Sequence, residues 1–182
     1  MLGKNRTVFI ICVVCSIVGL VLGFLFNEIA DEFIPITSQF NFSSPLQLAK
    51  SALMAITVPS KFLIVIFAAS YTIYALPAGL ISVFVNAVII SVNLKSMLQF
   101  NSFVDKIVCT AYTFCAMLSL WMIICAVCRG CKFQRSLAIY ARTPSEMILS
   151  RNSIIFVGDY VFISGIFLVA ELGGQMILSM LR

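Results

Sequence analysis

The chain alternates long apolar runs, which carry few or no charges, with short stretches that hold most of the charged residues. A membrane-spanning helix needs about 20 apolar residues, because each residue adds about 1.5 Å toward a hydrocarbon core of about 30 Å. The pattern therefore predicts an all-α protein, a polytopic transmembrane helical bundle that forms a single integral membrane domain, 1–182. The apolar runs cover residues 8–26, 62–94, 107–128 and 154–181.

The run 62–94 has 33 uncharged residues, which is too long for one span. As a single helix it would measure about 50 Å, more than a bilayer core accommodates even with strong tilt. Pro77 lacks a backbone donor and restricts the residue before it, so we expect the run to fold there into the spans 62–76 and 78–94. The first arm, 62–76, is short for a span. It is long enough only if the residues 52–60 extend the helix and the Lys61 side chain reaches to the headgroups. A re-entrant hairpin, and a single crossing that leaves four spans, stay open as alternatives.

The distribution of basic residues favours five spans with the N-terminus in the cytoplasm. Lys4 and Arg6 precede the first span, and the positive-inside rule places such residues on the cytoplasmic side. With five spans the segment 28–60 is external, while the loop 129–152, with five bases and one acid, is cytoplasmic. With four spans this most basic loop would lie outside. We therefore predict about five spans and an external C-terminus.

The composition agrees with a membrane protein. Hydrophobic residues make up 62% of the chain and charged residues 10%, whereas a soluble domain is about half apolar and about a quarter charged. The net charge of +5 comes from bases that flank apolar runs, so it indicates topology and gives no support to a nucleic-acid partner.

The residue types that are present also narrow the chemistry. Histidine is absent, which excludes His-dependent catalytic triads, His-ligated metals and imidazole proton relays. The seven cysteines lie mostly within or beside apolar runs, so we expect inert or acylated thiols and neither a metal centre nor a disulfide scaffold. The prediction is a protein that is not an enzyme and binds no cofactor.

Two acidic residues lie within the last apolar run. Asp159 and Glu171 are 12 residues apart, about 18 Å along a helix and about 120° around it, so they do not form one site. Asp159 is near enough to the start of the span to stay at the inner headgroups, with Arg151 as its expected partner. Glu171 lies deeper, where a charge costs about 2.5–3.5 kcal/mol. It belongs either to an ion or proton path or to a packed, neutral contact, and we favour the packed contact.

Two pairs of small residues predict close contacts between helices. Gly19 and Gly23 stand four residues apart in the first span, as do Ala170 and Gly174 in the last. Small side chains let helix backbones approach, and this packing drives helix association in lipid. The contacts lie either inside the subunit or with a partner.

The external segment 28–60 is the predicted docking site for another protein. Its apolar residues, Phe40 and Phe42 among them, alternate with polar ones, as expected of a recognition surface. The same side chains could equally lie in the headgroup layer, and both alternatives stay open. The expected partners are the lipid bilayer and other membrane or extracytoplasmic proteins.

The order of these features resembles a known family. A first span and a polar external segment are followed by Lys61-Phe62, an apolar run ending in Leu76-Pro77, and a last span that carries Gly158, Tyr160 and Glu171. This order is similar to that of the stage II sporulation protein M family of bacterial multi-spanning membrane proteins. The resemblance implies a non-enzymatic subunit of the cell membrane that anchors peptidoglycan hydrolases during spore engulfment. A small membrane subunit of a transporter or channel is the alternative.

Overall fold

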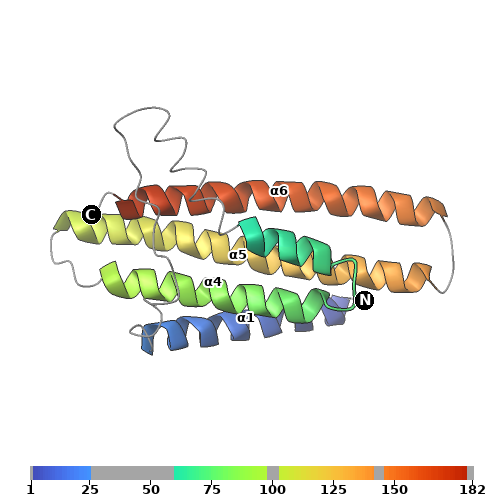
Figure 1. Cartoon of the computed structure of the whole chain (residues 1–182), viewed down its shortest axis with the longest axis horizontal. Helices are drawn as coiled ribbons and strands as arrows, with labels where there is room; N and C mark the ends of the chain where they lie inside the picture. The colour runs from blue at the N-terminus through green and yellow to red at the C-terminus, as the bar shows by residue number, and fades with distance from the viewer. Residues whose placement is uncertain (1, 26–59, 98–102, 142–145, 180–182) are drawn as a thin grey trace.

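The computed structural model describes residues 2–25, 60–97, 103–141 and 146–179, and their helices pack lengthwise into one bundle (Figure 1). No strand occurs among these residues, so the predicted all-α fold is confirmed for the described chain. The helices are α1 (Leu2–Leu25), a short helix (Ser60–Ala69), α4 (Ala75–Met97), α5 (Phe103–Tyr140) and α6 (Glu146–Ser179).

The four long helices are long and apolar enough to cross a membrane. Their outward faces are apolar as well, with Phe114, Phe162 and Val169 each at least 70% exposed. Leaving such surface in water would cost about 25 cal/mol per Å², whereas lipid accommodates it. The chain is therefore a multi-pass integral membrane protein that contacts lipid.

The run predicted to fold at Pro77 turns instead at 70–74, so that prediction was wrong in its position. Within the turn, Thr72 Oγ1 donates to Ala69 O at 2.9 Å and accepts from Tyr74 N at 3.2 Å. Such side-chain bonds compete with helical ones and end a helix. Pro77 stands in the first turn of α4, where its missing N–H has no helical partner to lose.

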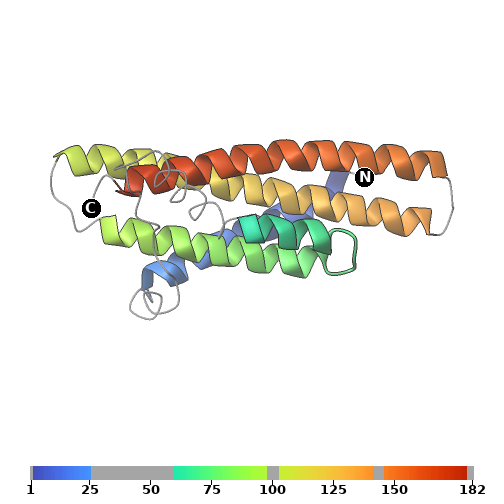
Figure 2. The same cartoon turned by 45° about the horizontal axis from the view of Figure 1, so that its top comes forward.

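The short helix before this turn does not span the bilayer by itself. Its 10 residues measure about 15 Å, half of a hydrocarbon core. Figures 1 and 2 show it antiparallel to α4, with the turn at the same end of the bundle as the N-terminus. In the described ranges the structure thus has four helices long enough to span, and a short arm where a fifth span was predicted.

Helices α1 and α4 run parallel and in close contact. Ser91 Oγ donates to Leu20 O at 2.6 Å, and Lys95 Nζ donates to Phe24 O at 2.9 Å. Both bonds join residues 71 positions apart in the chain, which gives the register of the pair. The carbonyl groups of α1 are accessible to these donors because the two backbones approach closely, at positions described below.

The basic segment predicted as a loop at 129–152 is mostly helical, so this prediction was wrong. Residues 129–140 are the last three turns of α5, and α6 begins at Glu146, eight residues before the predicted span. The physical reason is that the segment 129–140 is rich in good helix formers, among them Arg, Lys, Gln, Leu and Ala. No proline precedes Pro144 to stop the helix.

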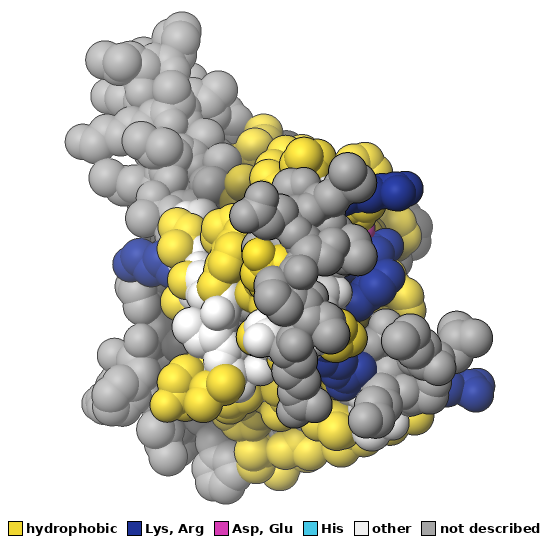
Figure 3. All heavy atoms as spheres, turned by 90° about the vertical axis from the view of Figure 1, so that its right-hand side faces the viewer, with side chains coloured by type: hydrophobic (Ala, Val, Ile, Leu, Met, Phe, Trp, Pro, Cys, Tyr) yellow, Lys and Arg dark blue, Asp and Glu magenta, His cyan; other side chains and the backbone are white. Residues whose placement is uncertain are grey.

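The helical extension brings the basic residues to the end of the bundle that also holds the N-terminus (Figure 1), while the C-terminus lies at the opposite end. Figure 3 looks onto the first of these ends and shows Lys and Arg side chains beside apolar ones. This placement agrees with the charge asymmetry used to orient the chain.

We expect single-cysteine variants R6C and A141C to react with a membrane-impermeant thiol reagent from one side of the membrane, and K106C from the other. The three side chains are exposed, and residue 106 lies at the opposite end of α5 from residue 141. The measurement is thiol labelling of intact and permeabilised cells in a background without the seven native cysteines. Labelling of R6C and A141C from opposite sides would contradict the arrangement.

Candidate functional site

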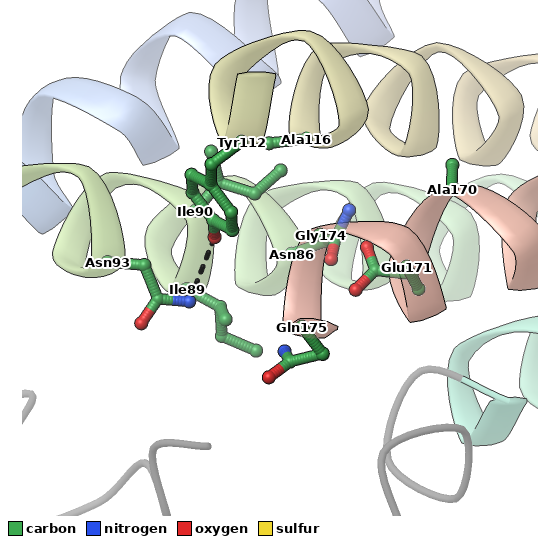
Figure 4. Close-up of a pocket in the computed structure, with 10 residues that line it drawn as sticks. All are labelled: Asn86, Ile89, Ile90, Asn93, Tyr112, Ala116, Ala170, Glu171, Gly174 and Gln175. Carbon is green, nitrogen blue, oxygen red and sulfur yellow. Dashed lines mark hydrogen bonds between the residues drawn. The ribbon is translucent and has the colours of Figure 1, made fainter. Parts of the chain in front are cut away.

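Polar side chains from α4, α5 and α6 meet inside the apolar bundle and form what we call the core polar cluster. Figure 4 shows Asn86 and Glu171 facing one another, with Gln175 one turn further along α6. They line a cavity of about 20 Å³, which has room for roughly one water molecule. The cluster consists of Asn86, Asn93, Tyr112, Ser119, Glu171 and Gln175.

Helical periodicity explains why these side chains converge. On α4 the two asparagines are seven residues apart, and on α5 Tyr112 and Ser119 have the same separation. Residues i and i+7 lie on one face of a helix, as do residues i and i+4, the spacing of Glu171 and Gln175. The sequence analysis found only Glu171. The heptad spacing of polar residues in two other spans was the signal that could have found the rest.

Glu171 of α6 lies beside Ser119 of α5. Ser119 Oγ donates to Ala116 O at 2.9 Å, and the Ser119 side chain is also within hydrogen-bonding reach of the Glu171 carboxyl group. This contact joins α5 to α6 inside the bundle, so Glu171 lies at a packed helix contact.

A second bond of the cluster joins α4 to α5, and two further groups need a partner. Asn93 Nδ2 donates to the Tyr112 hydroxyl at 3.0 Å, in a buried position. Asn86 Nδ2 and Gln175 Oε1 are buried without a hydrogen-bond partner among the described residues. Because a buried amide without a partner costs about 1–3 kcal/mol, one water in the cavity is the simplest partner for both.

Both small-residue pairs lie at helix contacts inside the subunit. A Cβ added to Gly19 or Gly23 would lie 2.8 Å from a backbone oxygen of α4, so these glycines permit the contact of α1 with α4. Ala170 is 4% exposed, and Gly174 packs on the Tyr112 ring and Cys115 of α5. The prediction of close backbone contact is confirmed for Gly19 and Gly23, and the contact lies within the subunit. At Gly174 an added Cβ would lie 3.6 Å from its nearest neighbours on α5, so the second pair lies at a helix contact without close backbone approach.

Asp159 has a different partner from the predicted one. Its Oδ2 lies 3.1 Å from Nη1 of Arg129, across the contact between α5 and α6. Arg151 is eight residues earlier on the same helix, about 12 Å along its axis, whereas the antiparallel α5 brings Arg129 directly opposite. The prediction of Arg151 as partner was therefore wrong. Both members of the observed pair are at least one third exposed, so the pair contributes little to stability.

The remaining predicted residues lie apart from the cluster or outside the described chain. Lys61 is exposed in the first turn of the short helix, and Pro77 is in the first turn of α4. Phe40 and Phe42 lie outside the described residues. All seven cysteines carry free thiols, with Cys12 of α1 against Cys128 of α5. Among the described residues no group of three or more acidic or cysteine side chains could hold a metal ion.

Comparison with known proteins adds no relative: no family model, no curated protein and no solved structure matches this chain. The class that the fold defines is a multi-pass helical membrane protein with a polar cluster in its core.

Proposed function

We propose that this membrane protein is a non-enzymatic scaffold, which anchors extracytoplasmic partner proteins at the bilayer. The observation that carries the proposal is the set of close contacts that hold the helices of the bundle together. Parallel α1 and α4 meet at backbone distance, and the polar groups of the core join α4, α5 and α6 to one another. A membrane body of this kind is suited to hold the segment 28–60, predicted to be external, in a constant position.

The resemblance noted in the sequence extends this proposal to particular partners. If the chain acts as members of the stage II sporulation protein M family are expected to act, its partners are peptidoglycan hydrolases and its site is a bacterial cell membrane during spore engulfment. Support for this step comes from the order of sequence features alone. The expected orientation, with the N-terminus in the cytoplasm, would put the end of α1, where the segment 28–60 follows, on the same side as the cell wall.

The scaffold is tested at the segment 28–60. We expect F40S/F42S to reduce partner copurification by roughly 30-fold, because the loss of an aromatic anchor at an interface typically costs more than about 1 kcal/mol, or about 2 kcal/mol for the pair. The measurement is affinity purification from crosslinked cells, with quantitative mass spectrometry and with the membrane level of the protein as the reference. Unchanged copurification at an unchanged membrane level would contradict docking at this segment.

A second candidate function, a subunit of a transporter or channel, is favoured by one observation. Glu171 is an ionisable side chain within a span, faces the bundle interior and lies beside amide groups, and such residues mark ion or proton paths in membrane proteins.

The two candidates predict different results for E171Q. As a scaffold the protein should keep its partners and its stability within about 0.5 kcal/mol, because glutamine is nearly isosteric with a neutral glutamic acid and keeps a hydrogen-bonding group beside Ser119. E171L, which lacks a donor, should lose about 1–3 kcal/mol and serves as the matched comparison. The measurements are partner copurification and thermal unfolding in detergent. Proton or sodium flux in proteoliposomes that E171Q abolishes would instead establish the transporter.

A further inference from the structure

We propose that a groove between α5 and α6 binds the phosphate headgroup of an anionic phospholipid. The groove has a volume of about 140 Å³ and lies on the basic part of α5. It is separate from the core polar cluster and shares no residue with it. The groove has one wall on α5 and one on α6. Its polar lining consists of Arg129, Lys132 and Ser136 from α5 and Asn152 and Asp159 from α6.

The donors of the groove suit a phosphate group. Arg129, Lys132 and Ser136 follow one another at spacings of three and four residues, so they form a row on one face of α5. Asn152 adds an amide from the opposite wall. Guanidinium, ammonium and amide groups all donate hydrogen bonds, and charge-assisted bonds to phosphate oxygens are the stronger ones. The Ser136 hydroxyl donates to Lys132 O at 3.3 Å, so it lines the groove without adding a donor.

The net charge of the groove matches a headgroup with a single negative charge. One nitrogen of the Arg129 guanidinium is held by Asp159 at 3.1 Å, and a guanidinium has five N–H donors, so others remain for a ligand. Two bases and one acid leave a charge of +1 at the site. A phosphodiester such as that of phosphatidylglycerol carries one negative charge and neutralises it.

The depth of the groove points to a lipid as the source of the phosphate. Arg129 directly follows the uncharged segment 107–128, which as a helix measures about 33 Å and therefore ends where a hydrocarbon core of about 30 Å ends. Apolar side chains of α6 lie between the polar ones in the lining of the groove, with Phe156 buried and Ile155 half exposed. A glycerol backbone and the start of an acyl chain can pack on these side chains, whereas free phosphate gains nothing from them. Basic pockets between helices at this depth are a known form of headgroup site.

Native mass spectrometry of the full chain in detergent tests the site. Titrated with phosphatidylglycerol, the native protein should retain one molecule in preference to phosphatidylcholine. K132Q should weaken this binding about fivefold, because one base near an anionic membrane surface contributes about 1 kcal/mol to the free energy of binding. Lys132 is chosen because its replacement leaves the pair of Arg129 and Asp159 in place.

Two further variants separate the groove from diffuse attraction by charge. K106Q removes an exposed lysine from the other end of the same helix, and it should leave the binding unchanged. S136W fills the groove without changing the charge, and it should abolish the bound lipid. A thermal unfolding curve in zwitterionic detergent verifies that each variant is folded, and an unfolded variant is replaced by K132M or S136F.

Three results would overturn the proposal. The first is an equal loss of binding in K106Q and K132Q, which indicates non-specific attraction. The second is unchanged retention of phosphatidylglycerol in folded S136W. The third is competition by glycerol 3-phosphate or inorganic phosphate at concentrations equal to that of the lipid, because the site would then be one for a soluble phosphate.

Discussion

Replacing both close-contact glycines of α1, as G19A/G23A, should separate α1 from α4 and destabilise the protein by about 4 kcal/mol, because each added methyl group overpacks a close contact. The built Cβ atoms would lie 2.8 Å from the carbonyl oxygens of Phe84 and Val88, and these are backbone atoms that cannot rotate away. Relief requires α1 to move as a whole. The hydrogen bond from Ser91 to Leu20, and the packing around it, would then be lost.

Cross-linking measures this separation directly. Cys15 Sγ lies 3.5 Å from Leu80 O, so in a background without the other cysteines a short bifunctional thiol reagent should join Cys15 to L80C, since such a reagent does not require disulfide geometry. We expect this cross-link to fall by at least tenfold in the double variant, together with the temperature of unfolding. The matched control is G158A/G165A on α6, where no atom lies within 4 Å of either built Cβ.

Alanine in the middle of a helix is more favourable than glycine by about 1 kcal/mol, so the control should be neutral or slightly stabilised. Equal stability and equal cross-linking in the two double variants would contradict backbone contact between α1 and α4.

Replacement of Phe156 by alanine should release the short helix and lower the free energy of unfolding by about 3 kcal/mol. Phe156 is 5% exposed and is stacked between two rings. Phe133 of α5 lies 4.2 Å from it with the planes 3° apart, and Phe67 of the short helix lies 5.7 Å from it on a plane 9° apart. Tyr160, whose hydroxyl donates to Leu63 O, completes the attachment.

The size of the effect follows from the lost ring contacts. In lipid, helices are held mainly by packing, so a cavity at this position removes most of what binds the short helix to α5 and α6. A loss of about 3 kcal/mol corresponds to a drop of about 6–12 °C in Tm for a chain of this length. The measurements are Tm in detergent and the labelling rate of A69C at the end of the short helix, which should rise.

The control for F156A is F162A, on the same helix and 70% exposed, which should change stability by no more than about 0.5 kcal/mol. F156L keeps most of the volume and should recover part of the loss. Similar values of Tm for F156A and F162A would show that the ring stack does not hold the short helix.

Some features of this protein could be predicted from its sequence because they depend on local pattern. Residues 107–128 and 8–26 lie within α5 and largely within α1, since backbone groups in lipid must bond within their own segment. The glycine pair of α1 was found because only small residues allow backbones to touch. By contrast, the turn at 70–74 was missed: it depends on short polar side chains that bond to nearby backbone, a weaker signal than a proline.

The sequence by itself determined the membrane class and the helical fold. Only the tertiary structure decided which faces meet: Arg129 with Asp159, Asn93 with Tyr112, and Glu171 with Ser119. The physical reason is that lipid is as apolar as the bundle core, so a helix face that packs on protein is composed much like one that faces lipid. Sparse polar and small residues mark the inner faces, and a helical period shows that such residues share a face. Their partners on other helices depend on the register and direction of those helices, which no pattern within one segment contains.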